Sequence, residues 1–190
     1  MSHERSLTLS AFPTELGWAA LVDTGSVVKQ IVVGYPSPAA AVAALDPSLA
    51  DKAQPHNSQS KLISRLQAFA AGATDDFRDV KIDVTHLTPF QQRVIACCRK
   101  LAYGRTCSYQ DLATKAGSPR AARAVGSAMA GNRYPLVVPC HRVISATGGI
   151  GSYSGPQGVR MKARLLEMEG RKPRRGASQS GVRAVPAPRR

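Results

Sequence analysis

Short runs of alternating apolar and polar residues occupy the first third of the chain. Residues 6–12 (SLTLSAF), 17–24 (GWAALVDT) and 26–35 (SVVKQIVVGY) are rich in β-branched residues and are bounded by turn-forming residues. This pattern predicts three strands. Thr24-Gly25 lies between the second and the third run and predicts a hairpin there.

The apolar spacing then changes to that of a helix. In residues 61–72 (KLISRLQAFAAG), apolar residues repeat at helical intervals from Leu62 to Phe69, and Gly72 can end the helix. Residues 79–87 (DVKIDVTHL) alternate again and predict one more strand.

The second half begins with a well-marked helix, TPFQQRVIACCRKLAYG. Thr88 is placed to cap it, Pro89 occupies its first position, and Gln91 follows three residues after the cap, which together predict a capping box. One face of this helix carries Phe90, Val94, Cys97, Cys98 and Leu101. We therefore expect both adjacent cysteines in the core.

Two short helices are predicted in CSYQDLATKAGSPRAARAVGSAMAGN. Ser108 and Asp111 frame the start of the first helix, and Gly117 can end it. A second helix is predicted from Ser118-Pro119 to about residue 130, which makes a helix-turn-helix. The small residues of the second helix suit close approach to DNA and equally suit tight packing inside a core, so both interpretations stay open.

The chain ends in a loop, a helix and a basic segment. Residues 149–158 (GIGSYSGPQG) predict a glycine-rich loop, and 159–170 (VRMKARLLEMEG) a last helix. Residues 171–190 hold seven basic residues, no acidic ones and three prolines, which predicts a disordered basic tail. We thus expect an α+β fold with an N-terminal α/β domain over residues 1–85, a helical C-terminal domain over 86–170 and the tail.

Charge and composition narrow the class of protein. The formal net charge of +14 over 190 residues indicates a polyanionic partner, with nucleic acid and an acidic membrane surface as the alternatives. A hydrophobic content of 43% is enough for a packed core. No run approaches 18 apolar residues, and residues 1–10 lack the apolar core of a secretory signal, so we expect a cytoplasmic protein.

The cysteines give no sign of a disulfide or of a metal. Cys97, Cys98, Cys107 and Cys140 all lie in the second half, and the adjacent pair would make a poor disulfide. We expect reduced thiols. Because no Cys-x-x-Cys pair occurs and the four histidines are scattered, we expect no metal site and no cofactor.

Cys140 and His141 are adjacent in VVPCHRVIS and could form a nucleophile and its base. A thiol reacts as the thiolate and so needs a base or a positive field. Neighbours in an extended segment point to opposite faces, so contact would require a turn or a bridging water. The histidine would also need an orienting carboxylate, for which Glu167 and Glu169 are candidates. From these residues alone, a buried structural cysteine remains the alternative.

A set of segments in fixed order resembles one family. TPFQQRV, YGRTCSYQDLA, RAARAVGSAMAGN, PLVVPCHRVI, GSYSG and LLEMEG cover roughly residues 88–170 and are similar to the O6-alkylguanine-DNA alkyltransferases. The resemblance implies a ribonuclease H-like N-terminal domain and a winged helix-turn-helix in the C-terminal domain. It implies direct-reversal DNA repair, in which a single-turnover methyltransferase moves the alkyl group from O6-alkylguanine irreversibly to its own cysteine.

The resemblance assigns catalytic roles to five residues. Cys140 is the implied alkyl acceptor, and His141 is the base, acting through a water. Glu169, directly before Gly170 as in the family pattern, would orient His141. Asn132 would order the turn around the site, and Tyr109 would assist the leaving guanine and help rotate the nucleotide out of the duplex.

The resemblance also implies residues for binding. Arg123 would fill the place that the flipped base leaves in the duplex. The further residues implied in DNA binding are Tyr109, Ala122, Gly126 and Ser127, and those implied in the guanine pocket are Met129, Val143, Tyr153 and Ser154. The implied partner is double-stranded DNA containing O6-alkylguanine, bound by a monomer without a membrane, in the nucleoid or in the nucleus of a eukaryote; O4-alkylthymine stays open as a second substrate.

The chain departs from the family pattern after Tyr153-Ser154. Gly155-Pro156 replaces a Gly-Gly pair, and about two extra residues precede Lys162. Proline fixes φ and removes an N–H, which bears on the flexibility of this loop and on the size of alkyl group it accepts. The alternative function is a non-reactive module that binds alkylguanine or regulates transcription as a winged helix, and the presence of Cys140 favours the reactive protein.

Overall fold

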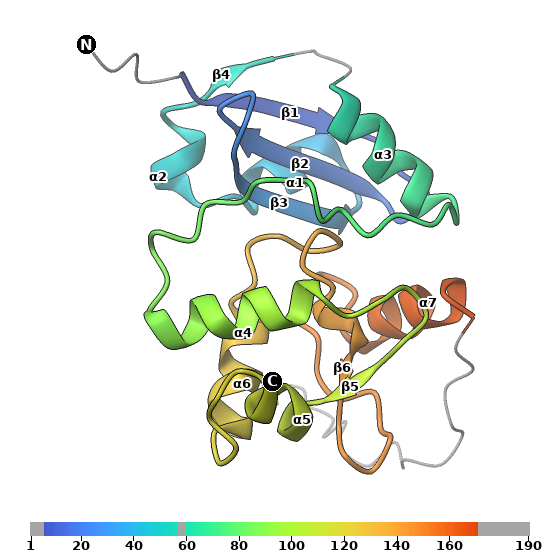
Figure 1. Ribbon diagram of the computed structural model, residues 1–190. Helices are drawn as coiled ribbons and strands as arrows, with labels where there is room; N and C mark the ends of the chain where they lie inside the picture. The colour runs from blue at the N-terminus through green and yellow to red at the C-terminus, as the bar shows by residue number, and fades with distance from the viewer. Residues whose placement is uncertain (1–5, 57–59, 171–190) are drawn as a thin grey trace, which may run out of the picture.

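A computed structural model describes residues 6–56 and 60–170 of the chain, so the basic segment 171–190 lies outside the described residues. Figure 1 shows a sheet with its helices in the upper half and a group of helices in the lower half. The fold is therefore mixed α and β, with the four-stranded sheet in the N-terminal half, as the sequence pattern predicts.

The sheet has the strand order β3-β2-β1-β4. Strands β1 (Thr8–Phe12), β2 (Trp18–Asp23) and β3 (Val28–Tyr35) form an antiparallel meander, which confirms the predicted strands and the hairpin. The two-residue strand β4 (Gln54–Pro55) pairs parallel to β1 and was not predicted from the sequence.

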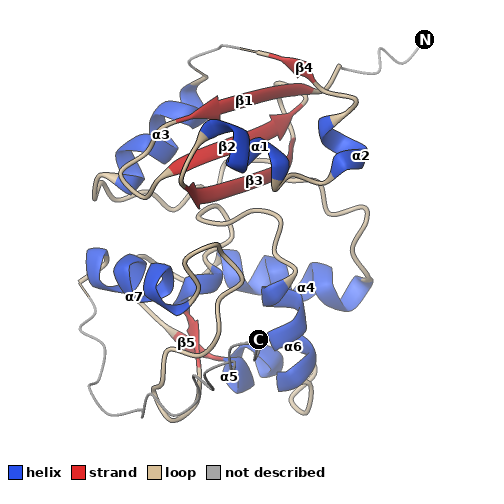
Figure 2. Cartoon of the chain, turned by 180° about the vertical axis from the view of Figure 1, so that it is seen from behind, coloured by secondary structure: helices blue, strands red, loops and turns tan. Residues whose placement is uncertain are grey.

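Helices cover both faces of this sheet. Figure 2 shows α1 (Pro38–Ala43) in front of the strands, whereas α3 (Lys61–Ala70) lies behind them. On β2, Ala20 and Val22 pack in the cluster that includes Ala41 of α1, and Leu21 packs in the cluster with Leu66 of α3. Because β2 is buried on both sides, its sequence reads as a continuous apolar run.

The helices of this half were only partly predicted. α3 has the predicted position, with Ser60 as its cap and the buried Phe69 near its end. α1 and α2 (Pro47–Ala50) were not predicted, because helices of six and four residues are too short to show a periodic apolar pattern.

The strand predicted over residues 79–87 is wrong. This segment makes one isolated bridge, between Ile82 and Val28 at the start of β3. Farther along β3, the N–H of Ile31 donates to the carbonyl of Arg133 instead (2.8 Å). The ladder cannot extend because another loop already pairs with this edge of β3.

Helix α4 (Pro89–Arg99) opens the second half with the predicted capping box between Thr88 and Gln91. Cys98 is fully buried on this helix, as predicted. The same expectation for Cys97 is met only in part: Cys97 is partly buried and packs against the core, and its Sγ lies 3.3 Å from the carbonyl of Lys115. Successive helical residues point about 100° apart, so one of two neighbours turns away from the core.

Helices α5 (Tyr109–Lys115) and α6 (Ala122–Ala130) pack against each other, and Ser108 caps α5 as predicted. The predicted start of the second helix at Ser118-Pro119 is wrong. The N–H of Ser118 donates to the carbonyl of Ala113 (2.9 Å), with Gly117 at a φ of 75°. Ser118 therefore still closes the end of α5 and cannot cap the next helix.

The remaining elements surround Cys140. A short 3₁₀ helix, η1 (Cys140–Arg142), leads into β6 (Val143–Ile144), which pairs with β5 (Cys107–Ser108). α7 (Val159–Met168) follows the glycine-rich loop, as predicted, and contacts η1.

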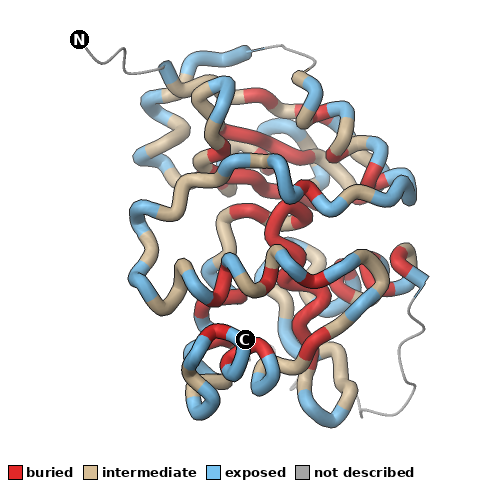
Figure 3. The backbone as a smooth tube through the Cα atoms, in the orientation of Figure 1, coloured by how far each residue is buried: buried red, intermediate tan, exposed pale blue. Residues whose placement is uncertain are grey.

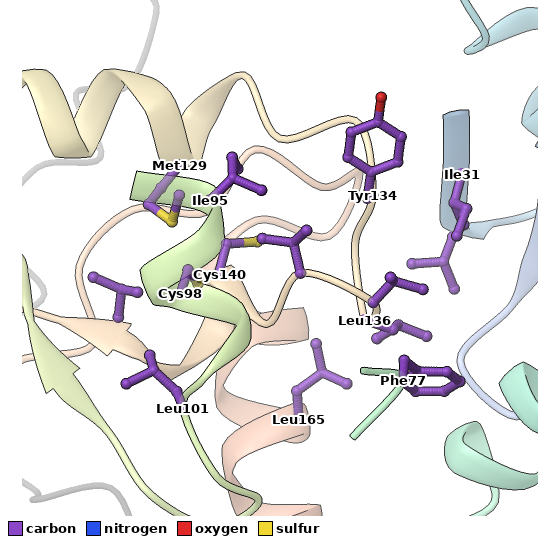
Figure 4. Close-up of a cluster of buried hydrophobic side chains, with 14 of the residues drawn as sticks. Ile31, Phe77, Ile95, Cys98, Leu101, Met129, Tyr134, Leu136, Cys140 and Leu165 are labelled. Atoms are coloured by element: carbon purple, nitrogen blue, oxygen red, sulfur yellow. The ribbon is translucent and has the colours of Figure 1, made fainter. Parts of the chain in front are cut away.

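One hydrophobic core runs through both halves. The tube in Figure 3 is buried where the chain passes between the sheet and the helices. Figure 4 shows Leu136 and Phe77 between Ile31 of β3 and Leu165 of α7, with Cys140 deeper among the helices. Leu136 has a φ of 72°, which is uncommon for a residue with a bulky side chain. The loop before Cys140 is thus anchored in packing that involves both halves.

Candidate active site

Cys140 lies in a tight turn. The N–H of Cys140 donates to the carbonyl of Val138 (2.8 Å), and the N–H of Arg142 donates to that of Pro139 (2.9 Å). The side chains of η1, including His141, are all buried. The backbone therefore turns at Cys140 and is not extended there, and both residues belong to the interior.

The thiol of Cys140 is held by Asn132, which follows α6. Nδ2 of Asn132 donates to Sγ of Cys140 (3.1 Å) and to the carbonyl of Val138 (3.0 Å), and its Oδ1 accepts from the N–H of Tyr134 (3.0 Å). Burial raises the pKa of the Cys140 thiol, and the Asn132 bond and the charge of Lys162 oppose this rise. The resting thiol is thus protonated and needs a base to react.

His141 is paired with Glu169 at the end of α7. Nε2 of His141 lies 2.9 Å from Oε1 of Glu169, and both side chains are buried. Glu169 also accepts hydrogen bonds from Arg142 and from the N–H of Gly104 (3.0 Å). Burial opposes ionisation of Glu169, but the bonds from His141 and Arg142 lower its pKa to about 2. Glu167, the other carboxylate considered, is exposed.

These contacts select one tautomer of His141. An ionised Glu169 can only accept hydrogen bonds, so Nε2 of His141 must carry the hydrogen. Burial lowers the pKa of His141, and Glu169 opposes this effect, so the ring is neutral at rest. Nδ1 then holds the lone pair, and within the described part of the chain it is buried without a hydrogen-bond partner. His141 therefore offers a free basic nitrogen in the interior.

Tyr109, the first residue of α5, lies beside a buried lysine. Nζ of Lys162 is 3.4 Å from the Tyr109 hydroxyl and donates to the carbonyls of Val143 (2.6 Å) and Ser152 (3.3 Å). Burial lowers the pKa of Lys162 to about 8 and raises the pKa of Tyr109. Lys162 thus contacts the hydroxyl of Tyr109, strand β6 and the glycine-rich loop at the same time.

The residues predicted to contact DNA lie along α6 and at the start of α5. Arg123 and Ser127 are exposed on α6, and Ala122 and Gly126 are partly exposed. A Cβ built on Gly126 would meet nothing within 4 Å. The opposite face, which includes Met129, is buried in the core. α6 therefore presents an open surface with Arg123 as its longest side chain.

A cavity of about 140 Å³ lies between this surface and Cys140. It is lined by predicted site residues from separate segments of the chain: Tyr109, Gly126, Met129, Cys140, Tyr153 and Ser154. We refer to it as the helix-side cavity. Val143 is buried instead, with its N–H bonded to the carbonyl of Cys140 and its carbonyl to Lys162.

Three residues that support the site were missed in the sequence. Arg142 stands next to His141, but nothing local shows that it reaches Glu169. Gly104 is part of the segment YGRTCSYQDLA, and its role depends on a contact 65 residues away. Lys162 carries a readable signal, because it occupies the apolar face of α7 with Met161, Leu165 and Leu166.

Residues 6–56 and 60–170 offer neither a membrane span nor a metal cluster. None of the helices there is both long and apolar enough to cross a membrane. No group of three or more His, Cys, Asp or Glu side chains in the same ranges could hold a metal ion.

Comparisons with known proteins agree on one group. Residues 89–171 match the family model described as the DNA-binding domain of 6-O-methylguanine DNA methyltransferase. The methylated-DNA–protein-cysteine methyltransferase of Mycobacterium tuberculosis is 44% identical over 110 residues, which span 58% of this chain and 64% of that protein. The human protein of the same name is 53% identical over 68 residues, 36% of this chain and 32% of its own length.

Solved structures match over more of the chain. The crystal structure of M. tuberculosis O6-methylguanine methyltransferase has a TM-score of 0.72 at 33% identity, covering 88% of this chain and 96% of that one. The same group includes a structure of M. tuberculosis OGT in complex with DNA, at a TM-score of 0.71, 33% identity and coverage of 86% and 93%. The similarity therefore extends over both halves of the fold.

Proposed function

Because this chain belongs to the family of O6-methylguanine-DNA methyltransferases, we propose that it repairs O6-alkylguanine in DNA by transferring the alkyl group to Cys140. The sequence match spans only 64% of the length of the M. tuberculosis relative. The proposed activity is therefore argued from the active-site geometry of this chain. The observation that carries the proposal is the arrangement of Cys140 with Asn132, His141 and Glu169.

The proposed reaction is one displacement at the alkyl carbon. The proton of the Cys140 thiol passes through a water to Nδ1 of His141, the nitrogen left free by the bond to Glu169. The sulfur–carbon bond forms while the carbon–O6 bond breaks, and the electron pair leaves with the guanine. The product is a thioether on Cys140, so each molecule acts once.

The leaving guanine needs a hydrogen bond or a proton. Tyr109 lines the helix-side cavity, and we assign it to donate to the departing base. Lys162, 3.4 Å from the hydroxyl, supplies a positive charge that strengthens this donor. Burial raises the pKa of Tyr109, which keeps the phenol in the donating, protonated form.

The target carbon is inaccessible inside a stacked duplex, so the nucleotide must be rotated out of it. The open surface of α6, with Ala122, Gly126 and Ser127, suits close approach to DNA next to the helix-side cavity. Arg123 would enter the space left by the base. Met129 and Tyr153 would then flank the base, while Ser154 of the same cavity would read its edge. Val143 was expected to share this role, but its N–H and its carbonyl already have partners within the protein.

The finer architecture belongs to the same proposal. We assign residues 1–85 to a ribonuclease H-like domain and residues 86–170 to a winged-helix alkyltransferase domain, in which α5 and α6 form the helix-turn-helix. The packing of α5 against α6 supports the helix-turn-helix. The protein would act as a monomer on double-stranded DNA, in the nucleoid or, in a eukaryote, in the nucleus.

The decisive experiment uses an oligonucleotide duplex with one O6-methylguanine. Intact-protein mass should rise by one methyl group per molecule, and peptide mapping should locate that group on Cys140. Cys140→Ser should abolish the transfer, whereas Cys97→Ser, at the edge of α4, should leave it unchanged. Tight binding without any gain in mass would point instead to a non-reactive module that recognises the damaged base.

The DNA-binding assignment has a separate test. Arg123→Ala should slow methyl transfer from the duplex by roughly tenfold or more, but should leave transfer from free O6-benzylguanine unchanged. The matched control is Arg120→Ala, which removes an exposed arginine just before α6. Equal slowing with both substrates would show that Arg123 acts on the fold or on the chemistry and not on DNA.

A further inference from the structure

The segment between α6 and Cys140 is fastened to the N-terminal half at Arg133. The carbonyl of Arg133 accepts a hydrogen bond from the N–H of Ile31 on β3 (2.8 Å), and Nη2 of its guanidinium lies 2.7 Å from Oδ2 of Asp46. Strand β3 is the strand of the sheet nearest to the helical half (Figure 1). Arg133 is therefore held by the N-terminal half through both its backbone and its side chain.

Asp46 offers Arg133 a carboxylate whose position is fixed. The N–H of Asp46 donates to Oε1 of Gln30 on β3 (2.8 Å). Its Oδ1 caps α2, because it accepts from the N–H (2.9 Å) and from the hydroxyl (2.7 Å) of Ser48. The hydrogen bonds from Ser48 and the charge of Arg133 lower the pKa of Asp46, so the carboxylate is ionised at neutral pH. The second oxygen, Oδ2, is the one that pairs with Arg133.

The residue directly before Arg133 is Asn132, whose Nδ2 donates to Sγ of Cys140 (3.1 Å). On one side, the N–H of Asn132 donates to the carbonyl of Met129 in α6 (3.3 Å). On the other side, a planar peptide bond joins Asn132 to Arg133, and Oδ1 of Asn132 accepts from the N–H of Tyr134 (3.0 Å). The position of the Asn132 amide is therefore set from two directions, by α6 and by the segment that Arg133 fastens.

The bond from Asn132 bears on the reactivity of the Cys140 thiol. Burial raises the pKa of this thiol, and Asn132, Lys162 and Tyr153 oppose the rise. A donor at the sulfur stabilises the thiolate more than the thiol, because a hydrogen bond to an ionised acceptor is the stronger one. The bond weakens steeply when its distance or its angle departs from the optimum. Of the three opposing groups, Asn132 is the one whose position depends on Arg133.

We propose that the ion pair between Arg133 and Asp46 positions the active site, because through it the N-terminal half holds Asn132 against the sulfur of Cys140 and eases the ionisation of the thiol. The proposal rests on the proposed alkyl transfer to Cys140 and deepens it. Arg133 acts through Asn132 and does not line the helix-side cavity, so it is a positioning residue and not a catalytic one. The half of the chain that holds none of the catalytic residues thus contributes to the rate.

The test follows the alkylation of Cys140 by iodoacetamide between pH 7.5 and pH 10.5, with peptide mapping to separate Cys140 from the other cysteines. Arg133→Met removes the charge but keeps the backbone bond to Ile31. It should slow this alkylation roughly three- to tenfold at pH 7.5, as expected if the pKa of the thiol rises by about 0.5 to 1. The difference should shrink as the pH rises. His86, whose pKa burial holds below its usual value, stays neutral over this range.

Two further variants isolate the ion pair. Arg133→Lys should restore the alkylation rate, because a single nitrogen of the guanidinium meets Asp46 and an ammonium can take its place. Asp46→Asn keeps a good cap for α2, but an amide has one oxygen and cannot serve Ser48 and Arg133 together. It should therefore slow alkylation as Arg133→Met does, and the double variant should be no slower than either single one. Methyl transfer from the duplex should slow by the same factor in each variant.

Arg65→Met is the matched control. It also removes an arginine from an ion pair of the N-terminal half, with Asp75 (2.7 Å), but away from Cys140. This variant should lower the stability to urea and leave the pH profile of Cys140 alkylation unchanged. A purely structural role of Arg133 would give the same result as this control.

The outcomes separate the two proposals. Equal pH profiles for Arg133→Met and the unmodified protein would overturn the positioning role, and so would equal slowing in Arg65→Met. If Arg133→Met does not fold, Asp46→Asn decides by the same comparison. Absence of methyl transfer from the duplex by the unmodified protein would refute the proposed function, whereas the iodoacetamide profiles would still test the link between Arg133 and Cys140.

Discussion

The guanidinium of Arg142 holds the carboxylate of Glu169 through three hydrogen bonds. Nε of Arg142 donates to both carboxylate oxygens (3.1 and 2.9 Å), and Nη2 donates to Oε1 (2.7 Å). Both side chains are buried, and Oε1 also faces Nε2 of His141. The arginine thus neutralises the carboxylate and fixes it for the histidine, as outer partners do in other catalytic sites.

Arg142→Lys should therefore damage both the fold and the chemistry. Lysine keeps the charge but loses the planar fork that binds two carboxylate oxygens. We expect methyl transfer to slow by roughly 10- to 100-fold and the free energy of unfolding to fall by about 3 kcal/mol. Single-turnover rates and urea unfolding measure the two effects. Arg65→Lys, at the more exposed pair with Asp75 and Asp79, is the control and should leave the rate unchanged.

The ionised state of Glu169 should be visible in the pH dependence of stability. Its pKa is lowered from 4.5 to about 2 in the folded protein. Ionised Glu169 therefore stabilises the fold fully above pH 4.5, and this stabilisation is lost as the pH falls toward 2. The lost free energy is on the order of 3 kcal/mol. In urea unfolding between pH 6 and pH 2.5, the free energy of unfolding should fall more steeply with pH in the unmodified protein than in Glu169→Gln. Equal slopes would contradict the assignment.

Lys162 should also make the stability rise with pH, but in an alkaline range. Burial lowers its pKa from 10.5 to about 8, so between these values the unfolded chain binds more protons than the folded one. Stability should then rise with pH in this range, because the cost of burying the charge disappears. Urea unfolding should show a higher free energy of unfolding at pH 9.5 than at pH 7.5, and this difference should be absent in Lys162→Met. Lys100→Met, at an exposed residue, should keep the gain.

Gly104→Ala should destabilise the protein more than a positive φ alone requires. Gly104 has a φ of 70°, and an added Cβ would lie 2.9 Å from the carbonyl oxygen of Glu169. Gly117 has a φ of 75° with nothing within 4 Å of the same position. We expect Gly117→Ala to cost about 1 kcal/mol in unfolding free energy and Gly104→Ala to cost about 3 kcal/mol or more. Equal losses would show that Glu169 adapts to the extra methyl group.

Gln157→Glu should release the loop beside Cys140. A carboxylate in place of the amide would face the carbonyls of Gly34 and Leu16, with no hydrogen to donate to either. We expect limited proteolysis to cut the loop faster, because two hydrogen bonds that fasten it to the N-terminal half are lost. Gln67→Glu is the matched control, because its amide also donates to a carbonyl, that of Pro13 (3.0 Å), away from the site. Unchanged proteolysis would show that Met161, which is buried against Gly34, holds the loop alone.

Local sequence signals predicted the elements whose hydrogen bonds close within a few residues. The capping box of Thr88 and Gln91 and the cap at Ser108 are of this kind. The strands before residue 36 were also predicted, because each pairs with the next strand along the chain through a short turn. The predictions failed where a distant segment or the preceding helix already used the backbone hydrogen-bonding group that the predicted element needed. Residues 79–87 alternate like a strand, but the loop at Arg133 pairs with β3.

Recognisable segments in a fixed order were enough to mark Cys140, His141, Asn132 and Glu169 as the residues that could carry the chemistry. How these residues are held in place could be learned only from the folded chain. Arg142 meets Glu169 across 27 residues, and Gln157 meets Gly34 across 123. The physical reason is that periodicity and capping act within a few residues, whereas these contacts exist only once the chain has folded and both halves have packed into one core.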